Sequence, residues 1–323
     1  MPLIENSTYR APWWLPGGHL QTIVPSLFRR VPVVTTERER LELEDGDFLD
    51  LAWSGRRSQR LVILSHGLEG SCDASYIQGM ARALVREGYD ALAWNFRGCG
   101  TEPNRLLSFY HSGATEDLAA VIRHALATHS AETIDLVGFS LGGNLTLKYL
   151  GEERQRPEQL RRAVAFSVPC DLADSAAKLS EPANRIYMTR FLRSLRAKLH
   201  VKDGIFPGEL DLGDLRKVRN FLEFDDRFTA PLHGFKDAND YWTRSSCRQF
   251  LPGIRIPTLL VNALNDPFLG GRCYPREEAE GSEFFFLETP KEGGHVGFLQ
   301  SENVCWAEQI SGRFLRPKFG SKS

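Results

Sequence analysis

The chain has 323 residues, of which 42% are hydrophobic and 25% are charged, so it can form a large core and has the composition of a globular protein. Its formal net charge of −1 excludes a general electrostatic preference for nucleic acid or anionic membranes. The six cysteines stand apart, and no Cys/His cluster has the spacing of a zinc site. We therefore predict no metal and no other cofactor.

The cysteines and the apolar patterning also indicate a compartment. Isolated cysteines fit a reducing environment, in which they behave as small apolar residues. The first residues, MPLIENSTYRAPWW, lack the basic and apolar segments of a signal peptide. No apolar stretch approaches the roughly 18 residues that a membrane span requires. We expect a cytoplasmic protein without stable membrane insertion and without a nucleic-acid partner.

From residue 60 onwards, short apolar strands alternate with helices. The predicted strands are residues 60–66, 89–98, 133–139 and 161–169. The predicted helices between them are residues 74–88, 113–129 and 141–153. Alternation with short links indicates βαβ units, so the predicted fold class is α/β, with a mostly parallel sheet flanked by helices on both faces.

The alternation stops near Cys170. Beyond it, residues 185–201 form a predicted helix in which apolar side chains recur every four residues: Tyr187, Phe191, Leu195 and Leu199. An irregular, aromatic-rich stretch follows this helix. We therefore predict one domain covering residues 1–323, interrupted by a mainly helical insertion at about 172–248.

The strand pattern resumes after the insertion. Residues 256–264 and 281–290 are predicted strands, and residues 301–315 are a predicted helix with Ser301 as its N-cap. We expect the terminal PKFGSKS, residues 317–323, to be disordered.

The sequence GFSLG at residues 138–142 lies where a predicted strand passes into a predicted helix. In such a crossing the central residue is held in a strained conformation above the carboxyl edge of the sheet. Gly138 and Gly142 satisfy the need for small residues where strand and helix approach each other. We predict that Ser140 is a nucleophile at the amino end of the helix. The alternative is an ordinary tight β–α turn.

A serine hydroxyl needs a base to take its proton and an acid to orient that base. In sheets of this kind both partners follow the nucleophile in the chain, the acid first and the histidine last. Asp266, in NDPF, and His295, in EGGHVGF, each follow a late strand and meet this order. Asn-Asp-Pro is also a good turn sequence, and Asp171 is an alternative acid. Three other histidines lie in candidate loops: His66, His111 and His233.

Chemistry at an acyl carbon also needs donors for the oxyanion that develops. The backbone N–H of Leu141, directly after the nucleophile, is one predicted donor. The second is the backbone N–H of Leu68, in the loop after the strand that ends LSHGLEGS, where Gly67 permits a sharp turn. We interpret His66 as a structural residue, because the main chain of this loop supplies the donor.

Together these segments resemble the YheT-type hydrolases of bacteria, a subfamily of the α/β-hydrolase superfamily. The resemblance extends along nearly the whole chain and includes PWWLPGGHLQT at 12–22, SHGLEGS at 65–71, segments between 95 and 118, GFSLGGN at 138–144, FDDRFTAPLHGFKDANDYW at 224–242, NDPF at 265–268 and EGGHVGF at 292–298. It implies that Ser140, His295 and Asp266 form a catalytic triad. Relatives often have two aspartates before the proline, whereas this chain has Asn265 and then Asp266.

The resemblance further implies a serine esterase that forms an acyl-enzyme with short- or medium-chain acyl esters or with lipid esters. Its partner would be a small-molecule or lipid-like ester, and the insertion would form a cap whose apolar lining admits the acyl chain. An acyltransferase would use the same triad, so that alternative stays open. A non-catalytic ligand-binding relative is a further alternative, although such proteins usually lack a triad member.

Three other features have two interpretations each. Trp13, Trp14 and His19, in PWWLPGGHLQT, either line the mouth of the site or pack over the core. Arg97 and the YHSG at 110–113 either position the substrate or brace the acid loop. The basic residues of the insertion either attract anionic head groups or form the solvated face of a helix: Arg190, Arg193, Arg196, Lys198 and Lys202.

Overall fold

The computed structural model describes residues 3–32, 34, 36–55, 57–301 and 304–316, so the disorder predicted for residues 317–323 lies outside the described residues. In the described part of the chain, nine strands form one sheet in the order β1-β9-β8-β7-β6-β4-β5-β3-β2. Neighbours are parallel from β1 to β5 in this order, whereas β3 is antiparallel to β5 and to β2. The predicted α/β class with a mostly parallel sheet is confirmed. The strands are β1 (Leu3–Ile4), β2 (Glu37–Glu42), β3 (Phe48–Ser54), β4 (Arg60–Ser65), β5 (Asp90–Trp94), β6 (Thr133–Phe139), β7 (Leu160–Phe166), β8 (Thr258–Val261) and β9 (Phe285–Glu288).

The antiparallel edge formed by β2 and β3 was not predicted. The sequence of β2, ERERLE, is largely charged, and its side chains are half-buried or exposed. Charged residues suit the outer strand of a sheet because they discourage pairing with another chain. The same composition gives no apolar alternation from which a strand would be predicted.

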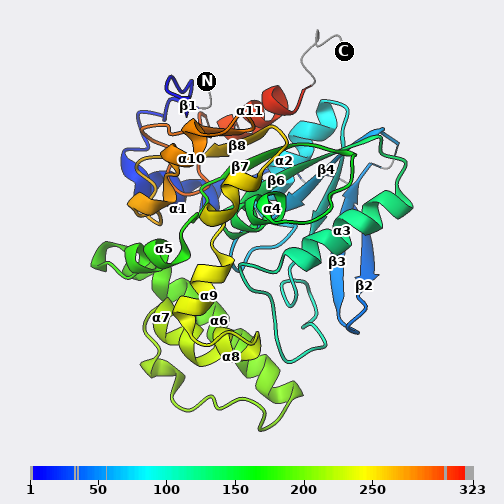
Figure 1. Cartoon of the computed structure of the whole chain (residues 1–323). Helices are drawn as coiled ribbons and strands as arrows, with labels where there is room; N and C mark the ends of the chain where they lie inside the picture. The colour runs from blue at the N-terminus through cyan, green and yellow to red at the C-terminus, as the bar shows by residue number, and fades with distance from the viewer. Residues whose placement is uncertain (1–2, 33, 35, 56, 302–303, 317–323) are drawn as a thin grey trace.

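Helices cover both faces of the sheet, as predicted (Figure 1). The helices are α1 (Gly17–Phe28), α2 (Ser75–Arg86), α3 (Thr115–Thr128), α4 (Leu141–Gly151), α5 (Leu172–Leu179), α6 (Arg185–Ile205), α7 (Phe221–Phe224), α8 (Ala230–Leu232), α9 (Ala238–Ser245), α10 (Arg276–Glu280) and α11 (Trp306–Leu315). Of these, α2 and α11 lie on one face, and α3 and α4 lie on the other.

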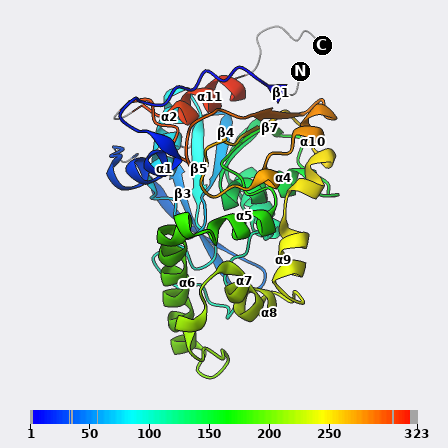
Figure 2. The same cartoon turned by 90° about the vertical axis from the view of Figure 1, so that its left-hand side faces the viewer.

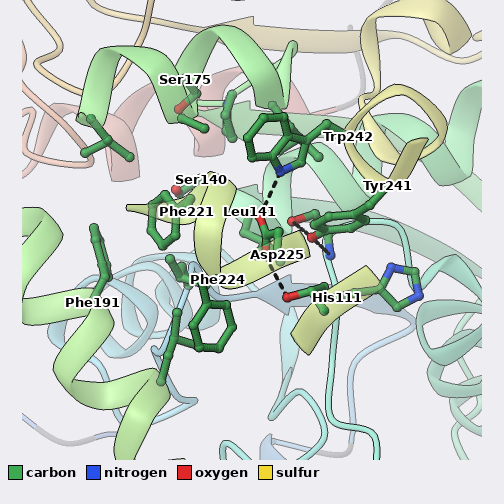
Figure 3. A pocket seen from close by; sticks show the side chains of 18 of the residues that line it. His111, Ser140, Leu141, Ser175, Phe191, Phe221, Phe224, Asp225, Tyr241 and Trp242 are labelled. Atoms are coloured by element: carbon green, nitrogen blue, oxygen red, sulfur yellow. Dashed lines mark hydrogen bonds between the residues drawn. The ribbon is translucent and has the colours of Figure 1, made fainter. Parts of the chain in front are cut away.

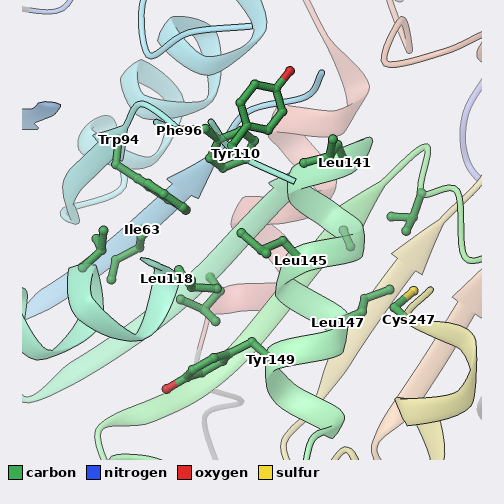
Figure 4. Packing of buried hydrophobic residues seen from close by; sticks show 14 of the residues in the cluster. Ile63, Trp94, Phe96, Tyr110, Leu118, Leu141, Leu145, Leu147, Tyr149 and Cys247 are labelled. Atoms are coloured by element: carbon green, nitrogen blue, oxygen red, sulfur yellow. The ribbon is translucent and has the colours of Figure 1, made fainter. Parts of the chain in front are cut away.

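The alternation of side chains along β4 produces two separate cores. Leu61 and Ile63 pack with α3 and α4, whereas Val62 packs with α2 and α11. Figure 4 shows Leu145 of α4 among the buried side chains of the first core, with Ile63 and Leu118 in the same cluster. A strand buried on both faces must be apolar throughout, which explains the continuous run LVIL.

Between β7 and β8 the chain leaves the sheet and forms α5 to α9. Both views show these helices gathered on one side of the sheet, away from the two chain ends (Figure 1, Figure 2). In α6 the predicted apolar face is confirmed, because Tyr187, Leu195 and Leu199 are buried and Phe191 is half-buried. This face packs into the core that also contains α3 and α4.

The basic side chains of α6 do not share one environment. Lys198 bonds Glu69, and Lys202 donates to the carbonyl oxygens of Asn104 and Leu106. Both interpretations given for this cluster are therefore wrong for these two lysines, which connect α6 to loops of the sheet. Arg196 is half-buried and donates to a main-chain carbonyl, whereas Arg190 and Arg193 are exposed.

The prediction that Ser301 caps the last helix is wrong. The helix α11 begins at Trp306, with Cys305 as its N-cap. Trp306 is buried, packs against Tyr9 and donates from its indole nitrogen to Thr8 Oγ1 at 3.0 Å. The start of the helix coincides with the packing of this indole against the amino-terminal segment, five residues after Ser301.

The junction between β6 and α4 is tightly packed. A Cβ atom on Gly138 would lie 2.5 Å from the carbonyl oxygen of Gly142, and a Cβ atom on Gly142 would clash with the carbonyl oxygens of Ser65 and His66. The requirement for small residues on both sides of Ser140 is therefore confirmed. It arises because the start of α4 lies directly against the ends of β4 and β6.

Replacing Gly142 with alanine should test this packing. We expect the free energy of unfolding in urea to fall by about 1–3 kcal/mol, because the neighbouring atoms are main-chain carbonyls that must shift. Gly204→Ala is a matched control, since Gly204 is also helical and a Cβ there meets no atom within 4 Å. That control should stabilise the protein by up to about 1 kcal/mol. Equal effects of the two substitutions would contradict the prediction.

Candidate active site

Ser140 lies at the turn between β6 and α4, at the N-cap position of the helix. Its backbone has φ 53° and ψ −118°, a conformation that costs a non-glycine residue about 1–3 kcal/mol. The turn is held by main-chain bonds, with the N–H of Ser140 donating to the carbonyl of Phe166 at 2.8 Å. The sequence prediction of a strained residue at this turn is therefore confirmed.

Three side chains predicted from distant parts of the sequence lie in one hydrogen-bonded row. Ser140 Oγ is 2.9 Å from His295 Nε2. His295 Nδ1 is 2.9 Å from Asp266 Oδ2 and 3.1 Å from Oδ1. With its proton on Nδ1, the imidazole donates to the carboxylate and accepts from the serine hydroxyl. This is the relation of nucleophile, base and orienting acid that acyl transfer uses.

The row is shielded on one side and open on the other. Asp266 is buried, and the ring of Phe268 lies 4.1 Å from that of His295. Ser140 and His295 face a cavity with about 800 Å³ of free space, its mouth included (Figure 3). Most of its wall is aliphatic or aromatic, and about half of the lining residues come from the segment α5 to α9, including Leu179, Phe191, Leu195, Phe221 and Trp242.

The two predicted amide donors lie beside the serine. Leu68 and Leu141 both line the cavity. A Cβ on Gly67 would be 3.7 Å from Ser140 Oγ, so the loop after β4 passes directly next to the hydroxyl. Among the described residues, no protein group accepts a hydrogen bond from either amide. Both N–H groups are available to a ligand at the serine.

Side chains around this loop hold it in place. Glu69, next to Leu68, has φ 52°; its N–H donates to Tyr110 Oη at 3.0 Å, and its carboxylate accepts from the same hydroxyl at 2.7 Å. Lys198 of α6 pairs with this carboxylate at 2.7 Å. The helical insertion is thereby tied to the loop that carries the Leu68 amide, a contact that the sequence did not indicate.

His66 has the structural role that was predicted. Burial lowers the pKa of His66 to about 4, so the ring is neutral. Its Nδ1 lies 2.7 Å from the carbonyl of Gly67, to which it donates, and its Nε2 accepts from the N–H of Phe96 at 3.2 Å. The ring therefore fixes the turn that presents Leu68.

The alternative acid and histidines are engaged elsewhere. Asp171 caps α5 by accepting from the N–H of Asp174, and it pairs with Arg272 at 2.7 Å. His111 and His233 pack against each other with ring centroids 4.6 Å apart. Burial lowers the pKa of His111 to about 3 and that of His233 to about 4. Both rings are neutral near pH 7, and neither bonds Ser140.

Arg97 neither positions substrate nor braces the acid loop. Its guanidinium bonds Asp117 through two nitrogens and pairs with Asp45 and Asp47. These contacts join α3 to the loop before β3. Of the YHSG segment, Tyr110, His111 and Ser112 line the cavity.

The segment PWWLPGGHLQT differs from both expectations. Trp13 is 92% exposed and Trp14 is 41% exposed, so neither indole packs over the core, and neither lines the cavity. His19 stacks on Tyr187 of α6 at 5.7 Å and bonds its hydroxyl at 3.1 Å. The buried members of this segment include Leu15 and Gln21.

Two residues of α1 hold the loops that carry Asp266 and His295. Neither was predicted from the sequence to belong to the site. Gln21 Oε1 accepts from the side-chain amide of Asn265 at 2.9 Å and from the N–H of Gly293 at 2.8 Å. Thr22 Oγ1 accepts from the N–H of His295 at 2.8 Å. Both residues end the motif PWWLPGGHLQT, and this position in the motif was the one sign in the sequence that they contribute to the site. Their partners are more than 240 positions away, so the sequence could not show the contact.

Comparison with known proteins identifies the family. The profile of the alpha/beta hydrolase fold matches residues 60–300. YheT of Escherichia coli (strain K12), an esterase by name, is 38% identical over 288 residues, covering 87% of this chain and 84% of that protein. The mouse phospholipase ABHD3 is 28% identical over 321 residues, covering 96% of this chain and 77% of the relative. A solved esterase of Pyrococcus furiosus matches with a TM-score of 0.59 at 19% identity, covering 87% of this chain and 90% of the other.

The chain therefore belongs to the α/β-hydrolase family, and within it to the YheT-type hydrolases. By class it is a carboxylic ester hydrolase. In the described residues, no three His, Cys, Asp or Glu side chains are grouped so that they could hold a metal ion. Nor does any described helix combine the length and the apolar character needed to cross a membrane.

The bond from Thr22 to the main chain of His295 can be tested with a near-isosteric pair of substitutions. Thr22→Val leaves the N–H of His295 without a partner, and we expect kcat on p-nitrophenyl butyrate to fall about ten-fold with KM within about two-fold. Thr22→Ser retains the hydroxyl and should retain most of the activity. Equal kcat values for Thr22→Val and wild type would show that the His295 loop does not depend on this bond.

Proposed function

We propose that the protein hydrolyses carboxylic esters with Ser140 as nucleophile, His295 as base and Asp266 as the orienting acid. The observation that carries the proposal is the continuous row of hydrogen bonds from Ser140 Oγ through His295 to Asp266, which opens onto an apolar cavity. The esterases and the phospholipase among its relatives support the same reaction.

In the first step, His295 Nε2 takes the proton of Ser140 while Oγ bonds the ester carbonyl carbon. The carbonyl oxygen becomes an oxyanion, which the amides of Leu68 and Leu141 stabilise; removing one such donor costs about 3 kcal/mol in the transition state. Collapse breaks the bond to the alcohol oxygen, and the alcohol leaves with the proton from His295. Ser140 then carries the acyl group.

In the second step, water replaces the alcohol. His295 takes a proton from the water as its oxygen bonds the acyl carbon, and collapse releases the carboxylic acid with return of the proton to Ser140. Asp266 keeps the proton on Nδ1 and stabilises the imidazolium that forms in each step. Every proton transfer runs through Nε2, so the chemistry needs no group beyond these residues and water.

The helices α5 to α9 act as a cap in this proposal. About half of the residues that line the cavity belong to this segment, and Phe191, Leu195 and Phe221 supply apolar surface for an acyl chain. The apolar lining suits a short or medium acyl chain, or one chain of a lipid ester. A cytoplasmic location is part of the proposal, in agreement with six cysteines that are all free thiols.

Two serines in the same cavity provide a matched test of the nucleophile. Ser140→Ala should lower kcat on p-nitrophenyl butyrate by at least about 10³-fold, because it removes the group that bonds the acyl carbon. Ser175→Ala is the control, since Ser175 lines the cavity but donates to the carbonyl of Phe268. Intact mass spectrometry after a fluorophosphonate probe should show one adduct in wild type and in Ser175→Ala. Labelling or turnover that survives in Ser140→Ala would refute the proposal.

Two neighbouring alanines of α5 test whether the cavity holds the acyl chain. Ala176 is buried and lines the cavity, whereas Ala177 is exposed. Ala176→Phe should lower kcat/KM for p-nitrophenyl octanoate at least about ten-fold, with a change of at most about three-fold for the acetate, because the added ring occupies space for the longer chain. Ala177→Phe should leave both esters unchanged. A uniform loss on both esters in Ala176→Phe would place the acyl chain elsewhere.

A further inference from the structure

The cavity that contains Ser140 also contains a buried carboxyl group that the proposed chemistry does not use. Asp225, within the segment FDDRFTAPLHGF, lines the wall formed by α7 and α9 and is 9% exposed (Figure 3). It is the first residue of the π-helical turn Asp225–Thr229. Such turns are rare and occur frequently at functional sites. A charged side chain is unexpected in a wall that is otherwise mostly apolar.

The hydrogen-bond partners of Asp225 are neutral. Thr229 Oγ1 donates to Oδ1 at 2.6 Å, and the indole nitrogen of Trp242 donates to Oδ2 at 2.8 Å. In the described part of the chain, no lysine, arginine or histidine pairs with this carboxyl group, and the negative charge of Asp226 adds to the rise of its pKa. A carboxylate accepts about four hydrogen bonds, so Asp225 has about two sites to spare.

A buried carboxylate without a cation is costly, because buried charges in proteins are normally paired. Burial raises the pKa of Asp225 to about 6, so most of the group is still deprotonated above neutral pH. A structural link to α9 does not require this charge. Asp226 makes such a link from the exposed side, where it accepts from the N–H of Ala238 at 2.7 Å.

The side chains beside Asp225 are aromatic. Trp242 bonds the carboxyl group, Phe224 precedes Asp225 in the chain, and Tyr241 and Phe221 line the same cavity (Figure 3). Aromatic faces attract cations, and aromatic walls are used to bind quaternary ammonium groups. A carboxylate bordered by aromatic rings therefore has the composition of an ammonium-binding site.

We propose that Asp225 and the aromatic side chains beside it bind a positively charged amine or quaternary ammonium group of the substrate while its ester lies at Ser140. This inference rests on the proposed function and specifies its substrate class: esters that carry a cation at a distance from the carbonyl. The cation supplies the missing partner of the buried carboxylate, and the apolar surface between the two sites accommodates the connecting chain.

The first test compares substrates on the wild-type enzyme at pH 7.5. One pair of p-nitrophenyl esters has acyl chains of equal length that end in trimethylammonium or in the neutral tert-butyl isostere. A second pair, the choline ester of butyrate and its neutral carbon isostere, places the cation on the alcohol. We expect kcat/KM to favour the cation by about ten-fold in at least one pair, mostly through KM. No preference in either pair would overturn the inference.

The second test assigns any preference to the carboxylate. Asp225→Asn should reduce the ratio of kcat/KM between cationic and neutral esters to about one. Asp226→Asn removes the same charge from the next residue, which does not line the cavity, and should keep the wild-type ratio. A preference that survives in Asp225→Asn would overturn the inference.

A third measurement separates the inference from the proposed function. Tetramethylammonium chloride is titrated into wild type and Asp225→Asn by calorimetry, and the dissociation constant should rise about ten-fold in the variant. This binding requires no turnover. If neutral esters are hydrolysed no faster by wild type than by Ser140→Ala, the proposed function fails, yet the titration still decides on the cation site. Equal dissociation constants would overturn the site alone.

Discussion

The structure depends most on the close contact between the first turn of α4 and the end of β4. That contact leaves no room for a side chain at Gly142, the packing of α4 on β6 leaves none at Gly138, and Ser140 between them has φ 53°. The strain is of the order of 1–3 kcal/mol, which the surrounding sheet and helix can oppose because both are buried. The serine is thereby fixed before any substrate arrives, with the loop of Leu68 beside it.

The other parts of the site are held by contacts to this junction from segments far apart in the chain. Thr22 and Gln21 of α1 fix the loops of His295 and Asp266 from one side. Lys198 of α6 reaches Glu69, beside the Leu68 amide, from the other. Since a shift of about 1 Å can be costly to an acyl-transfer site, these positioning bonds matter although none of them touches the reacting atoms.

The helical segment between β7 and β8 contributes about half of the residues that line the cavity at Ser140. Its apolar side chains are suited to an acyl chain, whereas Asp225 introduces a single charge into the same wall. In the proposed complex, the apolar side chains contact the acyl chain of a substrate and Asp225 binds its cationic group. We propose that residues in the loops at the end of the sheet carry out the hydrolysis, whereas the helical segment determines which esters bind.

Hydrophobic periodicity in the sequence determined the parallel strands from β4 onwards and the helices on both faces, and the GFSLG motif determined the tight turn at Ser140, because each depends on residues that are neighbours in the chain. Charged β2 gave no such signal. Tertiary packing alone decided which polar groups meet: Thr22 with the His295 loop, Lys198 with Glu69, and Trp306 with the amino-terminal segment. A hydrogen bond between residues hundreds of positions apart leaves no local pattern, since either partner would look the same in a solvated loop.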